Sequence, residues 1–123
     1  LCVQADGTIK HPLPDDPRLL ANRTISLCTP QVWKQGRFRI SSDPLPVMIL
    51  ASTDGYANSY ATDQDFHKIG ADYLRKVRRE GFDRVIANLP IILQETSRRG
   101  SGDDITLGMM YLENAALATA TVI

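Results

Sequence analysis

The sequence predicts an α+β fold in which an antiparallel sheet is covered on one face by a hairpin of two antiparallel helices. Two adjacent segments, joined near Gly81, carry apolar residues at helical spacing, and the apolar runs 47–51 and 105–112 are typical of strands. A chain of 123 residues is long enough for one core and buries roughly two-thirds of its surface on folding. We therefore expect a single domain over residues 1–123.

The N-terminal region predicts a β-hairpin followed by a loop. Residues 1–4 and 8–10 read as two short strands around a turn in which Gly7 can adopt positive φ. Proline fixes φ and lacks a backbone donor, so the proline-rich residues 12–17 predict a surface loop.

The next segment predicts two further strands and a short helix. Residues 24–28 are expected to be extended, and Thr29 followed by Pro30 is typical of a helix start, giving a helix through Trp33. Polar and apolar residues alternate over 37–41, which predicts a strand with one buried face. The run 47–51 does not alternate, which predicts a strand covered on both faces.

Two long helices are predicted between this strand and the last one. Thr62 and Asp65 have capping-box spacing at the start of a helix over residues 63–79. Gly81 supplies a stop, after which a second apolar stripe predicts another helix, with a kink at Pro90. A final, largely buried strand is expected over 105–112.

Composition disfavours several classes of partner. Fourteen basic residues balance fourteen acidic ones, so no net field attracts nucleic acid or an anionic membrane. The longest apolar runs, such as 115–123, are shorter than the roughly 20 residues that span a bilayer. Cys2 and Cys28 form no Cys-x-x-Cys pair, and the first thirty residues show no basic leader followed by an apolar stretch, so we expect a cytoplasmic location. Without a secretory signal, we expect no glycosylation at the acceptor pattern 22–24.

Two carboxylates are placed at neighbouring strand ends by this arrangement. If strand 47–51 pairs antiparallel with the strand starting at Ile105, Asp54 and Asp103 meet at one edge of the sheet. Neighbouring carboxylates repel each other unless a cation neutralises them, and Mg²⁺ or Mn²⁺ prefers such oxygen ligands. The alternative is that each Asp only forms a turn or a solvated loop, as is common at strand ends.

The residues around these carboxylates resemble a known family. Residues 48–59, which contain Asp54-Gly55, and residues 100–107, which contain Asp103-Asp104, are similar to the metal-binding motifs of type 2C metal-dependent serine/threonine protein phosphatases. The resemblance implies an α-β-β-α sandwich, Mg²⁺ or Mn²⁺ held by Asp54 and Asp103, and hydrolysis of phosphoserine or phosphothreonine in protein substrates by a metal-activated water. It places Asp104 where the family usually has Asn, and Thr106 at a hydroxyl position.

The resemblance also implies that part of the family's catalytic domain is missing. The Asp-Gly-x-Gly-Gly strand end, an upstream acidic ligand and the phosphate-binding Arg of the family have no counterpart here, and the chain opens on the strand-like Leu1-Cys2-Val3. We expect the C-terminal part of a catalytic domain, inactive alone and needing the missing N-terminal part. The alternatives are a pseudophosphatase or interaction module, or a fragment that self-associates.

Other candidates are weaker. Arg98 and Arg99 are predicted either to hold substrate phosphate or to balance local acid. Basic residues near the helix joint favour a solvated, dipole-complementing face over a docking patch. Trp33, Phe66 and Phe82 are predicted to be core residues.

Overall fold

The computed structural model describes residues 1–13, 16 and 26–112 and divides the chain into two units. The first unit comprises Leu1–Lys10 with Pro44–Ile123, and the second comprises His11–Asp43. The predictions for residues 22–24 and 115–123 lie outside the described residues. Among the described helices, none is both long enough and apolar enough to span a bilayer.

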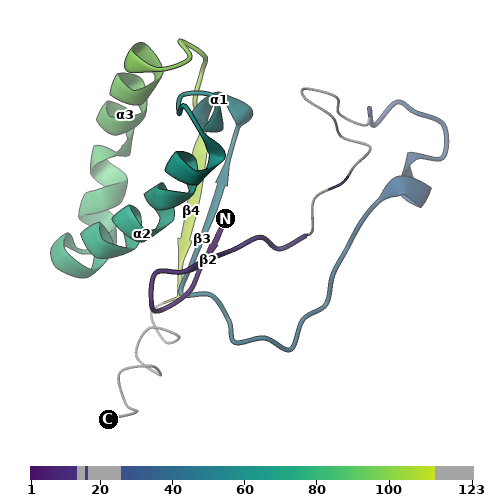
Figure 1. Ribbon diagram of the computed structural model, residues 1–123, viewed down its shortest axis with the longest axis horizontal. Helices are drawn as coiled ribbons and strands as arrows, with labels where there is room; N and C mark the ends of the chain where they lie inside the picture. Colours follow the sequence, from purple (N-terminus) through teal and green to yellow (C-terminus); the bar gives the residue numbers. More distant parts are fainter. Residues whose placement is uncertain (14–15, 17–25, 113–123) are drawn as a thin grey trace. The chain divides into compact units, whose positions relative to one another are not determined.

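The first unit contains a four-stranded antiparallel sheet, shown in Figure 1. Its strands are β1 (Cys2–Val3), β2 (Ile9–Lys10), β3 (Met48–Ser52) and β4 (Leu107–Tyr111), in the order β2-β1-β3-β4. The β1–β2 turn is closed by the Thr8 amide, which donates to the Asp6 carboxylate at 2.9 Å, and Gly7 adopts a φ of 87°. The predicted hairpin is therefore confirmed.

Helices follow β3 directly and return the chain to β4. They are α1 (Asp54–Ala57), α2 (Asp63–Glu80) and α3 (Phe82–Arg99). Gly81, with a φ of 89°, is the single residue between α2 and α3, so the chain reverses there as the sequence predicts (Figure 1). The antiparallel sheet and the two main helices confirm the α+β fold class.

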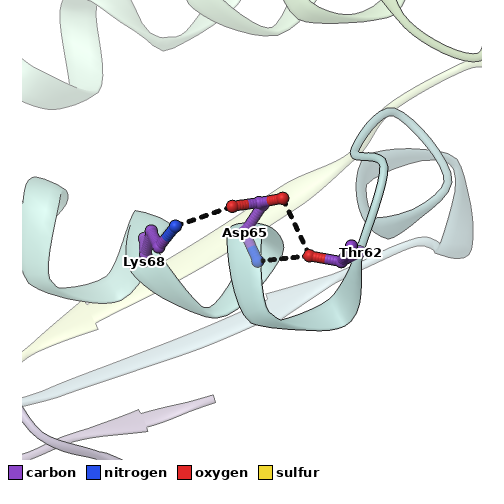
Figure 2. Close-up of polar contacts among 3 residues, drawn as sticks. All are labelled: Thr62, Asp65 and Lys68. Carbon is purple, nitrogen blue, oxygen red and sulfur yellow. Dashed lines mark hydrogen bonds and ion pairs between the residues drawn. The ribbon is translucent and has the colours of Figure 1, made fainter.

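The start of α2 is fixed by a small group of polar side chains, drawn in Figure 2. The Asp65 amide donates to the Thr62 hydroxyl at 3.1 Å, and that hydroxyl donates to the Asp65 carboxylate at 2.8 Å. Lys68 donates to the other carboxylate oxygen at 2.7 Å. The hydrogen bonds from Lys68 and then Thr62 lower the pKa of Asp65. The predicted N-cap is confirmed. In a capping box the Glu side chain accepts from the N-cap amide, whereas the shorter Asp65 side chain accepts from the Thr62 hydroxyl.

The hydrophobic core lies between the sheet and the helices. Its buried members are Val3, Val47, Met48, Leu50, Tyr56, Ile69, Tyr73, Leu74, Val77, Val85 and Leu89. The strand residues Val3 and Met48 pair in register, which places both on the face that α2 covers. The sequence predicted the apolar stripes of α2 and α3 correctly, because apolar residues that recur every 3.6 positions form one continuous face of a helix, and this face packs on the core.

Strands β3 and β4 are less buried than predicted. In β3, Met48 and Leu50 are buried, Ile49 is half-buried and Ala51 is exposed. In β4, half-buried and exposed residues alternate, and Met110 is 56% exposed. The prediction of coverage on both faces was wrong for the described residues of the first unit, because α2 and α3 lie on the same face of its sheet (Figure 1).

The second unit differs most from the sequence prediction. Residues 37–41 form no strand, and Phe38 and Ile40 are 88% and 90% exposed. Residues 26–28 form a turn instead of an extended segment, and the 3-10 helix Val32–Gln35 begins after Gln31. Trp33 is 73% exposed, so its assignment to the core was wrong. Alternation predicts a strand only where a partner supplies hydrogen bonds, and none of the described residues of this unit does so.

Three predictions about α3 and the aromatic residues have mixed outcomes. Helix α3 continues through Pro90 from Phe82 to Arg99, and the kink stays a prediction. Phe66 packs against the rings of Tyr56 and Tyr60, whereas Phe82 stacks on Tyr111. Both phenylalanines are partly buried against the core, but in separate places.

Candidate functional site

The end of β3 and the segment before β4 lie side by side. The ladder ends with Ser52 opposite Leu107, and one step further the Thr53 amide donates to the Thr106 carbonyl at 3.0 Å. The Thr106 amide donates in return to the Thr53 hydroxyl at 3.0 Å. That hydroxyl also donates to the Asp104 carbonyl, at 3.4 Å. The predicted meeting of these two segments is therefore confirmed for the backbone.

Gly55 allows the closest approach between them. A Cβ atom at this position would lie 2.7 Å from the Asp104 carbonyl oxygen and 3.0 Å from the Asp103 Cβ. Gly55 is buried and lies within α1, without a positive φ. A glycine is therefore required at this position by the short distance to the facing segment, and not by its backbone angles.

Asp54 is the first residue of α1 and is held by the residues that follow it. Thr53 has extended backbone angles at the N-cap, and the Asn58 amide donates to the Asp54 carbonyl at 2.9 Å. Tyr56 is only 1% exposed and anchors this single helical turn in the core. The Asp54 side chain is therefore presented from a short helix that is fixed by burial, with its carboxylate exposed.

Three serines hold the Asp103 segment in place, and the sequence analysis missed all of them. The Ser97 hydroxyl donates to the Asp103 carbonyl at 2.6 Å, and the Asp103 amide donates to the Ser101 hydroxyl at 3.2 Å. Ser59 and Ser101 both donate to the Gly55 carbonyl, at 2.8 and 3.1 Å. A serine four residues after a carbonyl within a helical turn, such as Ser59 after Gly55, was the available signal.

The two glycines around Ser101 shape this segment. A Cβ at Gly100 would lie 2.5–2.7 Å from three atoms of Ser59, so the segment packs directly on α1's C-terminal side. Gly102 has a φ of 77°, a conformation that glycine adopts readily, and its amide donates to the Ser97 carbonyl at 2.9 Å. The two glycines, Gly100 and Gly102, therefore allow the chain to turn tightly between the end of α3 and Asp103.

The acidic side chains at this edge are accessible to solvent. Asp54, Asp103 and Asp104 are all exposed. A groove of about 450 Å³ adjoins Asp103 and Asp104, and its other lining residues come from α3 and Ile105. A solvated cation can therefore reach this edge without a change in the packing.

The oxygen atoms of these carboxylates are the type of ligand that suits a hard divalent cation. Carboxylate oxygens are the ligands that Mg²⁺ and Mn²⁺ prefer, and Asp54 and Asp103 come from the two segments that Gly55 brings together. Within the described residues, no cluster of three or more Asp, Glu, His or Cys side chains is present. The metal site and the ligand roles of Asp54 and Asp103 therefore stay a prediction.

The arginines at the end of α3 serve at least one structural role. Arg99 forms an ion pair with Glu95, one helical turn earlier, at 2.5 Å. Arg98 and Arg99 both lie in the last turn of α3, where cations stabilise the negative end of the helix dipole. Because Glu95 is an acid of α3 and not Asp103, phosphate binding and balance of the acid near Asp103 both stay predictions.

A cluster of tyrosines lies behind α1 and is built for packing. The Tyr56 and Tyr73 hydroxyls lie 2.8 Å apart, and burial raises the pKa of both. The pKa of Tyr60 is also raised by burial. The three phenols therefore stay neutral near pH 7. They line a cavity of about 110 Å³, and none of them can act there as an ionised base.

Comparison with known proteins gives one family. The family model described as protein phosphatase 2C matches residues 1–93, which include β1 to β3, α1, α2 and most of α3. The match includes Asp54 and ends before Asp103. Neither the curated proteins nor the solved structures contain a significant match to this chain.

Proposed function

Because the chain belongs to the protein phosphatase 2C family, we propose that it supplies one part of the catalytic domain of a serine/threonine protein phosphatase. In this proposal Asp54 and Asp103 are ligands of Mg²⁺ or Mn²⁺. The observation that carries it is the close approach of Gly55 to Asp103, which brings the residues next to both carboxylates together at the sheet edge. The family's substrates imply phosphoproteins as partners.

The chemical roles follow from the positions of this chain's own residues. A bound divalent cation would supply Lewis-acid activation of water and neutralise phosphate charge. Asp54 is presented from α1, just after β3, and Asp103 from the segment between α3 and β4, so the two proposed ligands flank the same end of the β3–β4 ladder. The exposed carboxylates leave room for a phosphoprotein segment to reach the cation.

The proposal includes a second part of the catalytic domain. Two carboxylates are few for tight Mg²⁺ binding, which uses near-octahedral coordination. The resemblance assigns the remaining ligands and the phosphate-binding Arg to a preceding N-terminal part. We therefore propose that this chain alone binds the cation weakly and does not hydrolyse phosphothreonine peptides. A cytoplasmic location also stays a prediction.

A calorimetric titration of the chain with Mn²⁺ tests the ligand assignment. Asp54→Asn and Asp103→Asn are each expected to weaken Mn²⁺ binding by about ten-fold or more, because each removes a charged oxygen ligand. Asp83→Asn is the matched control, since Asp83 is an exposed carboxylate in the first turn of α3 and lies at the opposite end of that helix from Asp103. This control should bind Mn²⁺ like the wild type.

Three outcomes would count against the proposal. Equal Mn²⁺ binding by wild type, Asp54→Asn and Asp103→Asn would exclude the ligand roles. An absence of Mn²⁺ binding by the folded wild-type chain would exclude the metal half-site and favour an interaction module without catalysis. Phosphate release from a phosphothreonine peptide by this chain alone would contradict the need for a second part.

A further inference from the structure

We propose that Ser59 and Ser101 are positioning residues that clamp the Asp103 segment onto α1 and so set the spacing between Asp54 and Asp103. This inference rests on the proposed metal half-site and adds two residues to it. Within the part of the chain that the structure describes, neither serine hydroxyl bonds to a carboxylate; both bond to the backbone of the segments that carry Asp54 and Asp103. We call the group formed by Ser59, Ser101 and the Gly55 carbonyl the serine clasp.

The clasp converges on one carbonyl oxygen. Ser59 donates to the Gly55 carbonyl from four residues further along the chain, and Ser101 donates to the same oxygen from 46 residues away. A carbonyl oxygen has two lone pairs and accepts both bonds. The two hydroxyl oxygens lie 3.1 Å apart, so the Ser59 hydroxyl, the Ser101 hydroxyl and the Gly55 carbonyl are all in mutual contact. The peptide next to Asp54 is thereby tied to the residue two positions before Asp103.

The clasp also fixes the backbone of Asp103 itself. While the Ser101 hydroxyl donates its proton to Gly55, its oxygen accepts the Asp103 amide at 3.2 Å. The Ser101 amide donates to the Ser59 oxygen at 3.4 Å. A single side chain, Ser101, thus connects the backbone of one proposed ligand to the backbone beside the other.

Close packing leaves the clasp little freedom. The absent Cβ of Gly100 would collide with Ser59, and that of Gly55 would collide with the Asp104 carbonyl. Both collisions involve backbone atoms, which cannot move aside as a flexible side chain can. The segments therefore meet at one separation, and the hydroxyls of the clasp hold them there. Metal sites need such support, because ligand spacing decides the coordination geometry.

Amide hydrogen exchange tests the clasp without metal. Ser101→Ala is expected to speed exchange of the Asp103 amide about five-fold, the effect of losing one hydrogen bond. Ser101→Thr keeps the hydroxyl and should restore slow exchange. Ser41→Ala is the matched control, because the Asp43 amide donates to Ser41 at 3.1 Å over the same two-residue spacing in the other unit. An unchanged Asp103 exchange rate in Ser101→Ala would overturn the clasp.

Mn²⁺ affinity tests the positioning role. Ser101→Ala and Ser59→Ala are expected to weaken Mn²⁺ binding about ten-fold, with Ser101→Thr and Ser41→Ala within about two-fold of wild type. Unchanged Mn²⁺ affinity in both alanine variants, with wild type binding, would overturn only the positioning role. An absence of Mn²⁺ binding by wild type would overturn the metal half-site and the positioning role together, whereas the exchange result reports on the clasp itself.

Discussion

Gly55→Ala is expected to separate the two segments that carry the proposed metal ligands. The new methyl group would lie 2.7 Å from the Asp104 carbonyl oxygen and 3.0 Å from the Asp103 Cβ. Overpacking of this kind costs about 1–3 kcal/mol, and the better helix propensity of alanine offsets at most about 1 kcal/mol. We expect a net loss of about 2 kcal/mol in the free energy of unfolding, together with loss of the Thr53–Thr106 backbone hydrogen bond.

Urea denaturation followed by circular dichroism measures the change in the free energy of unfolding. Hydrogen exchange of the Thr53 amide measures the loss of its hydrogen bond to Thr106. The helices α2 and α3 dominate the helical signal, whereas the single Trp33 is exposed in the second unit and does not report on the core. Gly108→Ala is the control, because its Cβ would lie an ordinary 3.7 Å from the Ala51 carbonyl oxygen. A Gly55→Ala variant as stable as Gly108→Ala would contradict the close approach.

Tyr56→Ala is expected to cause the largest loss of stability. Tyr56 is 1% exposed, its ring lies 5.7 Å from the Phe66 ring, and its hydroxyl lies 2.8 Å from that of Tyr73. Truncation of a buried aromatic side chain costs about 3–5 kcal/mol, which is a large fraction of the roughly 5–15 kcal/mol that stabilises a typical domain. Because Tyr56 anchors α1, the variant should also release Asp54 from its fixed position.

Tyr56→Phe separates the hydroxyl from the ring in the same assay. This variant keeps the aromatic packing and leaves the Tyr73 hydroxyl without its partner at 2.8 Å, so a loss of about 1–2 kcal/mol is expected. Urea midpoints in the order wild type, Tyr56→Phe, Tyr56→Ala would support the account. Equal stability of Tyr56→Ala and wild type would exclude Tyr56 as the anchor of α1.

The elements with strong local signals were predicted from the sequence. The capping pair at Thr62 and Asp65, the helical stripes and the stop at Gly81 each specify structure over a few neighbouring residues. The pairing of the strand before Asp54 with the strand after Asp103 followed from the order of elements and is present in the ladder. The cap, the stripes and the stop depend on backbone geometry that the residues encode locally, whereas the strand pairing was stated in the sequence analysis as a condition for the meeting of Asp54 and Asp103.

The features that depend on distant partners were not predictable in the same way. The alternation over 37–41 describes a strand only if another strand pairs with it, and no described residue does. Similarly, Trp33 has the size of a core residue, but nothing near it in sequence determines whether it is covered. The burial of a strand face or a tryptophan is decided by tertiary contacts that local patterns do not contain.

The support for the candidate site left only a weak signal in the sequence, the spacing of four between Gly55 and Ser59. Asp54 and Asp103 stand out because carboxylates next to glycines are typical of metal sites, whereas Ser59 and Ser101 are common surface residue types. Their role follows only from the meeting of both hydroxyls at the Gly55 carbonyl, across 46 residues of sequence in the case of Ser101. Hydrogen bonds between residues so far apart produce no periodic pattern in the sequence.

The most direct test of the account is paramagnetic broadening of the amide signals by Mn²⁺ in the wild-type chain. If Asp54 and Asp103 bind one cation, the signals of residues 53–56 and 102–105 should lose intensity together, at the same Mn²⁺ concentration, while signals around Asp83 persist. Broadening of one segment alone, or of the two segments at clearly different Mn²⁺ concentrations, would contradict a shared metal site.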